Sequence, residues 1–155
     1  FPTATVMHRL DMATSGLMVM ALNKPATDTC KQCELRETAK TYQAVTFDEV
    51  QQYSEKSDLP LICDRANCPK QMVDHERGKK AQHIDGGLNA TPSQQSCELK
   101  PVTYRSHHLR VHNVDIQYPV IGDSLYTHDQ ALEMANRLNL HAMFLNSRPP
   151  LQNTL

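Results

Sequence analysis

The sequence has no long run of apolar residues and no excess of charge of either sign. None of its apolar stretches approaches the roughly 18 residues that a membrane-spanning helix needs. Its first residues, Phe-Pro-Thr-Ala, lack the basic and apolar regions of a signal peptide. We therefore expect a soluble, cytoplasmic protein with no membrane partner. The formal net charge of −1 gives no global electrostatic reason to bind nucleic acid, so any such site must be a local patch.

Internal repeats and low-complexity tracts are also absent. The chain has 155 residues, of which 39% are hydrophobic and 21% charged, so it is long enough for one domain with a real core and too short for two. We expect a single domain over residues 1–155. Because the chain begins without Met and runs directly into an apparent strand, we also expect it to be part of a longer polypeptide.

The five cysteines are an odd number in a chain without a secretion signal, which favours reduced thiols. Cys30-x-x-Cys33 followed by Cys63-x4-Cys68 has a spacing compatible with a zinc site. However, the first pair falls in a helix-like stretch, and the flanks lack the turn residues of a zinc knuckle. Ordinary thiols are therefore the favoured interpretation, and a metal-binding domain is the alternative.

Short apolar and polar patterns predict a mixture of strands and helices. The predicted strands are 17–22, 41–47, 59–63, 71–75, 99–103 and 140–145, and we expect the first of them to be buried. The predicted helices are 26–37, 106–116 and 128–138, with Ser106 as the N-cap of the second. Gly86-Gly87 is expected to form a turn. Strict alternation of strand and helix is missing, which favours an α+β fold over a doubly wound sheet.

Two segments carry polar groups that could perform chemistry. In His8-Arg-Leu-Asp-Met-Ala-Thr-Ser-Gly16, a polar turn precedes an apolar strand, and such turns present side chains at the rim of a sheet. By itself, an aspartate in such a turn is more often a helix cap or part of an Asx-turn than a catalytic group. The window 104–112 contains two arginines and three histidines with no acid, which makes it the best basic patch in the chain.

His108 and His112 would share one face of a helix, a spacing that can bind a metal ion. No acidic third ligand stands at a matching offset, so contact with phosphate or solvent is the favoured interpretation of both histidines.

The segment 8–16, followed by its apolar strand, closely resembles the signature of RluA-family RNA pseudouridine synthases. Further similar motifs follow in the family's order: Lys40-x-Tyr42-x-Ala44-Val45, Arg105-Ser106-His107-x-Leu109-Arg110-Val111-His112, Pro119-Val120-Ile121-Gly122-Asp123 with Tyr126, and Leu140-His141-Ala142. Residues 59–64 and 69–71 resemble those members that modify both large-subunit ribosomal RNA and a transfer RNA anticodon stem-loop. The resemblance covers most of the chain.

This resemblance implies the pseudouridine synthase catalytic fold, an α+β fold with a mixed, mainly antiparallel sheet flanked by helices and loops. It implies that Asp11 is the nucleophilic aspartate, that Arg105 pairs with it, and that Tyr42 packs against the target base. An ionised carboxylate can attack either the ribose anomeric carbon or the uracil ring, and a neighbouring guanidinium favours the ionised state. The detached uracil then rotates and rejoins through a carbon, which needs no cofactor or metal.

The resemblance also implies contacts with structured RNA, either ribosomal RNA or transfer RNA. Arg9 matches an arginine that enters the RNA helix near the displaced nucleotide, where a stacking side chain offsets part of the few kcal/mol lost on extrusion. Leu140 would form an apolar wall of the base pocket. Phosphate contacts are expected from Arg110, His107 and Lys100. We expect the protein to act as a monomer.

The chain departs from the family's pattern at several places. Tyr104 stands where the family usually has Gly, and His108 where it has Gln, so Tyr104 is expected to crowd the pocket or strain the turn. The strand that usually precedes residue 1 and a last apolar strand after Leu145 are both missing. A catalytically impaired RNA-binding relative of the same fold is therefore the alternative to an active isomerase.

Overall fold

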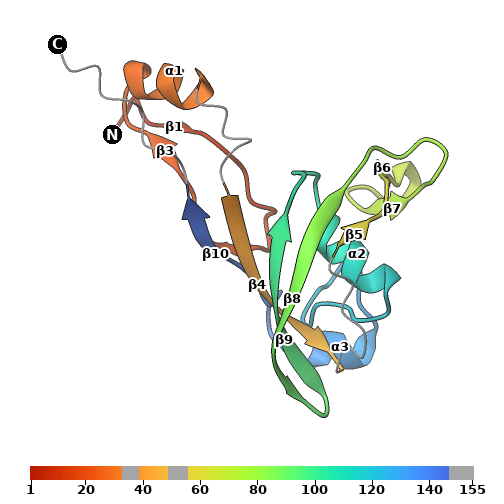
Figure 1. Ribbon diagram of the computed structural model, residues 1–155. Helices are drawn as coiled ribbons and strands as arrows, with labels where there is room; N and C mark the ends of the chain where they lie inside the picture. Colours follow the sequence, from red (N-terminus) through yellow and green to blue (C-terminus); the bar gives the residue numbers. More distant parts are fainter. Residues whose placement is uncertain (33–38, 49–55, 147–155) are drawn as a thin grey trace.

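A six-stranded sheet forms the framework of the protein in the computed structural model, which describes residues 1–32, 39–48 and 56–146. The strands are, in spatial order, β2 (Ser15–Gly16), β10 (Leu140–Asn146), β4 (Ala39–Phe47), β9 (Gln94–Pro101), β8 (Gln82–Thr91) and β5 (Ser57–Asp58). Every neighbouring pair is antiparallel except β2 with β10, which is parallel (Figure 1). The predicted α+β class with a mixed, mainly antiparallel sheet is confirmed.

Smaller elements flank this sheet. Strand β1 (Thr5–Val6) pairs with β3 (Met20–Ala21). Strands β6 (Leu61–Cys63) and β7 (Gln71–Val73) form a hairpin, and the short 3-10 helix η2 (Arg65–Asn67) lies between them in sequence. The helices are α1 (Lys24–Gln32), α2 (His108–Asp115) and α3 (Asp129–Glu133). Figure 1 shows α1 with β1 and β3 at one end of the molecule, and the β6–β7 hairpin far from them at the other. The central strands lie between these two ends.

The core packs against the middle of the sheet. Strand β4 alternates side chains between its two faces, so Tyr42 and Ala44 point to the same side. Their buried neighbours come from β9, α2, β10 and the connecting loops: Cys97, Leu99, Leu109, Val120, Leu138, Leu140 and Ala142. The core therefore fixes α2 against the sheet, and with it the segment that precedes this helix.

Most of the predicted strands are present in the structure. The strands expected at 41–47 and 140–145 are confirmed as β4 and β10, and those at 59–63 and 71–75 pair as the β6–β7 hairpin. The strand expected at 99–103 is formed only in part: residues 99–101 are the end of β9, which begins at Gln94, and residues 102 and 103 lie beyond the strand. Gly86-Gly87 is not a turn, because both residues lie inside β8, which has a register shift after Gly87. Glycine inside a strand often marks such a bulge.

The apolar run 17–22 is not one buried strand. Only Met20 and Ala21 form β3, and Leu17, Met18 and Met20 are about half exposed. The run passes from pairing with β10, where the Leu17 amide donates to the Ala142 carbonyl at 2.9 Å, to pairing with β1. Because its backbone changes partner within a few residues, it forms no continuous strand.

The predicted helices differ from the observed ones at their ends. Helix α1 begins two residues earlier than expected, where Asn23 Oδ1 accepts from the Ala26 amide, and the expected residues 33–37 lie outside the described residues. Ser106 is not the N-cap of α2; His107 occupies that position with a left-handed φ of 58°. Helix α3 ends at Glu133 because the Ala131 carbonyl accepts from the Gly122 amide instead of continuing the helix.

None of the helices in the described part of the chain is long and apolar enough to cross a membrane. In the same residues, no group of three or more histidine, cysteine or acidic side chains is arranged to hold a metal ion. Of the four cysteines in the described part, Cys63 and Cys68 are exposed, Cys97 is buried, and none forms a disulfide. Cys33 lies outside the described residues.

Candidate active site

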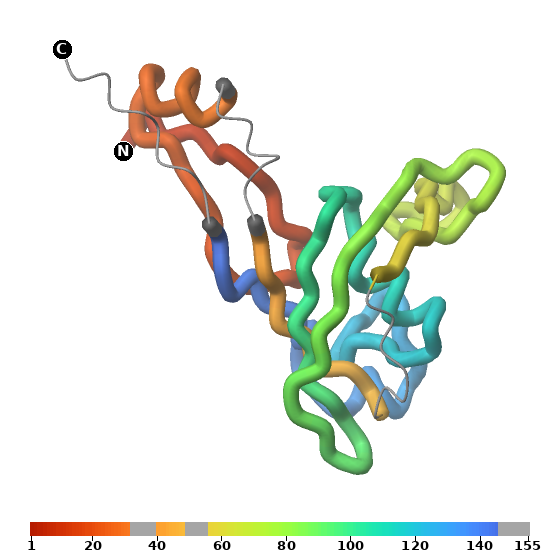
Figure 2. Tube along the Cα trace, viewed as in Figure 1, coloured from red at the N-terminus to blue at the C-terminus, as the bar shows by residue number. Residues whose placement is uncertain are grey.

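Asp11 stands at the start of a tight turn that is tied to the sheet on its far side. The Thr14 amide donates to the Asp11 carbonyl at 2.9 Å, which closes the turn, and β2 follows at once. Ser15 and Gly16 pair in parallel with His141 and Ala142 of β10, and Figure 2 shows this N-terminal segment beside β10. The turn that carries Asp11 therefore has a fixed position relative to the central sheet.

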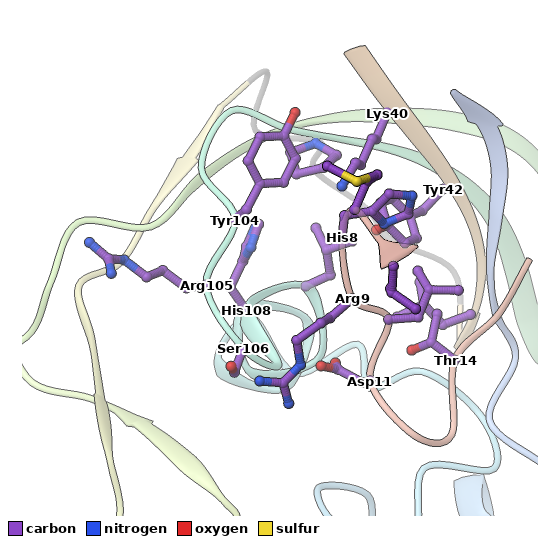
Figure 3. A pocket seen from close by; sticks show the side chains of 16 residues that line it. His8, Arg9, Asp11, Thr14, Lys40, Tyr42, Tyr104, Arg105, Ser106 and His108 are labelled. Carbon is purple, nitrogen blue, oxygen red and sulfur yellow. The ribbon is translucent and has the colours of Figure 1, made fainter. Parts of the chain in front are cut away.

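The carboxylate opens into a pocket of about 750 Å³, a size common among small-molecule sites. The pocket is lined by four segments that are far apart in sequence. They are Val6, Met7, His8, Arg9, Leu10, Asp11 and Thr14; Lys40 and Tyr42 of β4; Pro101, Tyr104, Arg105, Ser106, His108 and Leu109; and Leu140 of β10. Figure 3 shows this lining from close by. The segments singled out in the sequence thus meet in one cavity.

Tyr42 and Leu140 form the apolar wall of the pocket. Both are buried and lie on adjacent strands, where Tyr42 pairs with Ala142 and Leu140 with Ala44. Burial raises the pKa of Tyr42 to about 12, and the Asp11 carboxylate and Tyr104 add to this rise. The Tyr42 side chain is therefore a neutral ring with a hydroxyl at its tip.

The structure does not bring Arg105 to Asp11, so the predicted pairing of these two residues is wrong in its geometry. Arg105 lines the pocket, but its side chain extends away from Asp11 (Figure 3), and its Nε donates to the Lys80 carbonyl at 3.5 Å. In the part of the chain that the structure describes, no ion pair joins Asp11 to either arginine of the motif. The turn between β9 and α2 directs Arg105 outward, which the sequence alone did not reveal.

Arg110 does not line the pocket, but it is the arginine of the motif whose charge interacts with Asp11. Its guanidinium is buried and binds Asp123 with two hydrogen bonds, one of them from Nε to Oδ2 at 2.7 Å, and it lies 5.0 Å from the ring centroid of Tyr126. Burial by itself would lower the pKa of Arg110, but the hydrogen bonds and charge of Asp123, with the charge of Asp11, raise it above its ordinary value. Arg110 is therefore a buried cation held in one orientation, and its charge interacts with that of Asp11.

His107 links Asp11 to the same network. Its Nε2 lies 4.0 Å from Asp11 Oδ1, and its Nδ1 lies 2.7 Å from the hydroxyl of Tyr126, which accepts from the Gln71 amide at 2.7 Å. Burial lowers the pKa of His107 more than the Asp11 carboxylate raises it. A mostly neutral imidazole thus lies beside Asp11.

The other predicted contact residues have different positions. Arg9 is exposed and extends toward the end of the pocket that holds Asp11 (Figure 3). Lys100 does not line the pocket; it is exposed and forms an ion pair with Glu98. Tyr104 lines the cavity without filling it, and its φ is not positive, so the expected crowding and strain are not found.

Comparison with known proteins assigns this arrangement to a family. The family model described as RNA pseudouridylate synthase matches residues 2–113. A protein of Yersinia pestis named "Dual-specificity RNA pseudouridine synthase RluA" is 46% identical over 147 residues, which are 94% of this chain and 71% of that protein. The chain belongs to the RNA pseudouridylate synthase family. The predicted family, whose members are isomerases, is confirmed.

Other members support the same assignment. The protein of the same name from Escherichia coli (strain K12) is 43% identical over 152 residues, covering 97% of this chain and 69% of that protein. The solved structure of "Human RNA Pseudouridylate Synthase Domain Containing 1" has a TM-score of 0.80 at 28% identity, covering 94% of this chain and 64% of that chain. The chain thus spans about two thirds of the length of these pseudouridine synthases.

Sequence reasoning overlooked several residues of this synthase's site. Lys40 was noted only as part of a motif, although the alternation of side chains along β4 places it on the same face as Tyr42. Asp123 and Tyr126 were noted without a role, although a buried arginine requires an acidic partner. His8 accepts a hydrogen bond from the Val19 amide at Nε2, and no sequence signal indicated that contact.

Proposed function

We propose that the protein isomerises specific uridines in structured RNA to pseudouridine, with Asp11 as the nucleophile. The observation that carries this proposal is the position of Asp11, whose side chain is 25% exposed and opens into a pocket walled by Tyr42 and Leu140. An apolar wall suits a uracil ring, and a single carboxylate beside it suits covalent attack.

The proposed reaction begins when a uridine leaves the RNA stack and enters the pocket. The Asp11 carboxylate attacks the ribose anomeric carbon or the uracil ring, and the glycosidic bond to nitrogen breaks. The uracil turns between Tyr42 and Leu140, and a new bond forms from a ring carbon to the ribose. If Asp11 is bonded to the ribose, the ring carbon displaces it as the new bond forms; if Asp11 is bonded to the ring, it leaves at the end. The ring carbon loses its proton and the ring nitrogen gains one, so this route uses no cofactor.

Arg110, in place of Arg105, is the proposed partner of Asp11. A guanidinium held by Asp123 and Tyr126 cannot turn away, so its charge acts on Asp11 in a fixed direction. Low local dielectric strengthens this effect, because Arg110 exposes only 2% of its surface. His107 contributes a second, mostly neutral contact on the same side.

The pocket also has the charge that an RNA substrate requires. Its lining includes three cations, Arg9, Lys40 and Arg105, against one acid, Asp11. This local excess contrasts with the net charge of −1 for the whole chain. Arg9 is the proposed residue that enters the RNA beside the displaced nucleotide, and Arg105 and Lys100 are proposed phosphate contacts.

The relatives named for dual specificity suggest the substrates. We infer that the protein acts on large-subunit ribosomal RNA and on a transfer RNA anticodon stem-loop, in the cytoplasm where these RNAs are found. We further infer a single catalytic domain that works as a monomer. Sedimentation of the purified protein with and without RNA tests the last point.

Chemical mapping of pseudouridine tests the proposal directly. Ribosomal and transfer RNA from cells that lack the protein should miss specific pseudouridines, and the wild-type protein should restore them. Asp11→Asn should restore none, while its RNA affinity stays within about tenfold, or about 1.4 kcal/mol, of the wild-type value. Asp115→Asn, at an exposed position, is the matched control and should behave as wild type.

An Asp11→Asn protein that still forms pseudouridine would refute the assignment of the nucleophile. Wild-type protein that binds these RNAs but modifies none of them would instead support the catalytically impaired relative.

A further inference from the structure

The pocket has room for more than the reacting base. Its volume of about 750 Å³ lies in the range of about 300–1,000 Å³ that holds drug-sized molecules, and a uracil ring is much smaller than those. Figure 3 shows Tyr104 and Lys40 at the end of the pocket opposite Asp11. The proposed reaction uses only the Asp11 end, so the opposite end has no assigned role.

Tyr104 presents an aromatic ring at that opposite end. The residue is 42% exposed although it lines the pocket, and the ammonium of Lys40 lies over its ring, 4.7 Å from the centroid. One ring face is therefore covered by a cation, and the exposed remainder adjoins the space where RNA would enter. An exposed aromatic ring next to a positively charged group is the usual arrangement for stacking an unpaired base.

The turn that carries Tyr104 is held in place before any ligand arrives. The Val102 and Thr103 amides both donate to the Gln82 carbonyl, at 2.8 and 3.1 Å, and the Gln82 amide donates to the Thr103 hydroxyl at 2.8 Å. Gln82 is buried in β8. Because the turn and the ring are already ordered, stacking on Tyr104 loses little conformational entropy.

Lys40 adds an unbalanced charge to this end of the pocket. The side chain is buried, and burial lowers its pKa. Within residues 1–32, 39–48 and 56–146, no carboxylate lies at ion-pair distance from its ammonium group. A buried ammonium without an acidic partner favours an anionic ligand, and each nucleotide of RNA carries a phosphate.

We propose that Tyr104 and Lys40 form a second nucleotide subsite, in which the Tyr104 ring stacks on the unpaired base next to the reacting uridine. This inference rests on the proposed function. It makes Tyr104 a specificity-determining residue, because the site then requires two adjacent unstacked nucleotides.

The absence of tryptophan from the chain allows a direct test. In Tyr104→Trp the introduced indole is the sole tryptophan, and its fluorescence should fall when a synthetic transfer RNA anticodon stem-loop binds. The same RNA should be used with an abasic residue on one side or the other of the uridine that the wild-type protein modifies. One of the two abasic RNAs should lose the quenching.

Binding measurements give a second readout, which distinguishes the loss of aromatic stacking from a change in side-chain volume. Tyr104→Leu should weaken binding of the intact stem-loop about tenfold, the loss of one base–aromatic stack, and Tyr104→Phe should stay within about twofold. For the abasic RNA that abolishes quenching, Tyr104→Leu and wild type should bind equally. Equal binding of the intact RNA by Tyr104→Leu and wild type would overturn the subsite.

The same RNA distinguishes this inference from the proposed function. If the wild-type protein forms pseudouridine and Tyr104→Leu does not change RNA binding, the subsite is rejected and the proposed isomerase activity stands. Quenching and weakened binding without pseudouridine formation reject the isomerase and keep the subsite. No binding of the stem-loop by wild-type protein counts against both.

Discussion

The two arginines of the segment 105–110 have opposite environments. Arg110 is buried and bound by Asp123, whereas Arg105 is exposed and contacts a backbone carbonyl. A buried guanidinium is held in one orientation and can orient the Asp11 carboxylate, whereas an exposed guanidinium can meet phosphates. The difference in burial therefore assigns a positioning role to Arg110 and an RNA-binding role to Arg105.

Replacing Arg110 should remove activity and stability together. In Arg110→Met, kcat should fall by about 10²–10³, because a fixed charge beside the reacting carboxylate is lost. The free energy of unfolding should fall by about 3–5 kcal/mol, because Asp123 is left as an unpaired buried charge. Single-turnover kinetics and urea denaturation measure the two effects.

A double variant separates these effects. Arg110→Met with Asp123→Asn removes both charges, and the amide oxygen of Asn can still accept from the Leu125 and Tyr126 amides. Much of the stability should return while the activity stays low. If activity returned with stability, the role of Arg110 would be structural only.

Arg105 should behave as a binding residue. In Arg105→Ala, KM for RNA should rise while kcat changes little, because an exposed phosphate contact acts alike on the bound substrate and the transition state. The slope of log affinity against log salt concentration should fall by about one unit. A large loss of kcat with unchanged salt dependence would instead return Arg105 to the reaction itself.

Sequence patterns identified the site better than they identified the partners within it. The polar turn before an apolar strand made Asp11 a candidate, and the alternation of 41–47 indicated a strand, because both signals are local. The roles of Asp11 and Tyr42 were implied only by the resemblance to the family. The partner of Asp11 depends on how the turn between β9 and α2 aims Arg105 and buries Arg110. That direction results from tertiary packing, including the left-handed φ of 58° at His107, which no local pattern specified.

The parallel pairing of β2 with β10 is the element on which the position of Asp11 depends most. Gly16 has a φ of +123°, and a Cβ at this position would lie 2.5 Å from the Ala142 backbone nitrogen. In Gly16→Ala, the free energy of unfolding should therefore fall by about 1–3 kcal/mol, and activity should fall further as the Asp11 turn shifts. Thermal unfolding and turnover assays measure these losses.

Gly86 offers the matched control on another strand. A Cβ at Gly86 would meet its nearest atoms, the Glu98 backbone oxygen and side chain, at 3.7 and 3.8 Å, which is ordinary contact. Gly86→Ala should therefore change neither stability nor turnover by much. Equal losses in the two variants would argue against a special role of the β2–β10 contact.

At the level of elements, the accuracy of prediction followed the strength of the local signal. The β-branched and aromatic alternation of 41–47 predicted β4 correctly, and the strand expected at 140–145 is β10. The helix expected at 128–138 ended early because the Ala131 carbonyl is taken by a distant amide, that of Gly122. Such competition for hydrogen bonds is a tertiary effect, so the apolar pattern of the helix could not reveal it.

Across the whole molecule, a buried cluster of histidines joins the sheet to α2, and one of its members, His108, also lines the pocket. The rings of His83, His108 and His112 lie with centroids 5.0–5.4 Å apart. His83 Nε2 is 2.7 Å from Asp85 Oδ1, and His112 Nε2 donates to the Leu59 carbonyl at 3.0 Å. Protonating this cluster would place like charges in the core, so it couples the stability of the fold to pH.

The sign of that coupling follows from the pKa values. Burial, with the neighbouring histidines, lowers the pKa of His108 from 6.5 to about 3, and burial lowers that of His112 to about 4. Below pH 6.5 the unfolded chain takes up protons that the folded chain does not. The free energy of unfolding should therefore decrease as the pH falls, and His108 alone should contribute up to about 1.4 kcal/mol per pH unit.

His108→Gln should make this decrease less steep, because glutamine takes up no proton in either state. Urea denaturation at several pH values between 6.5 and 5, above the range where most carboxylates titrate, measures the slope. His75→Gln is the control, since it removes an exposed histidine and leaves the cluster intact. The slope, and not the stability at one pH, is the decisive quantity, because any buried substitution can change packing. An unchanged slope in His108→Gln would mean that His108 takes up its proton equally in the folded and unfolded chain, which its buried position within the cluster argues against.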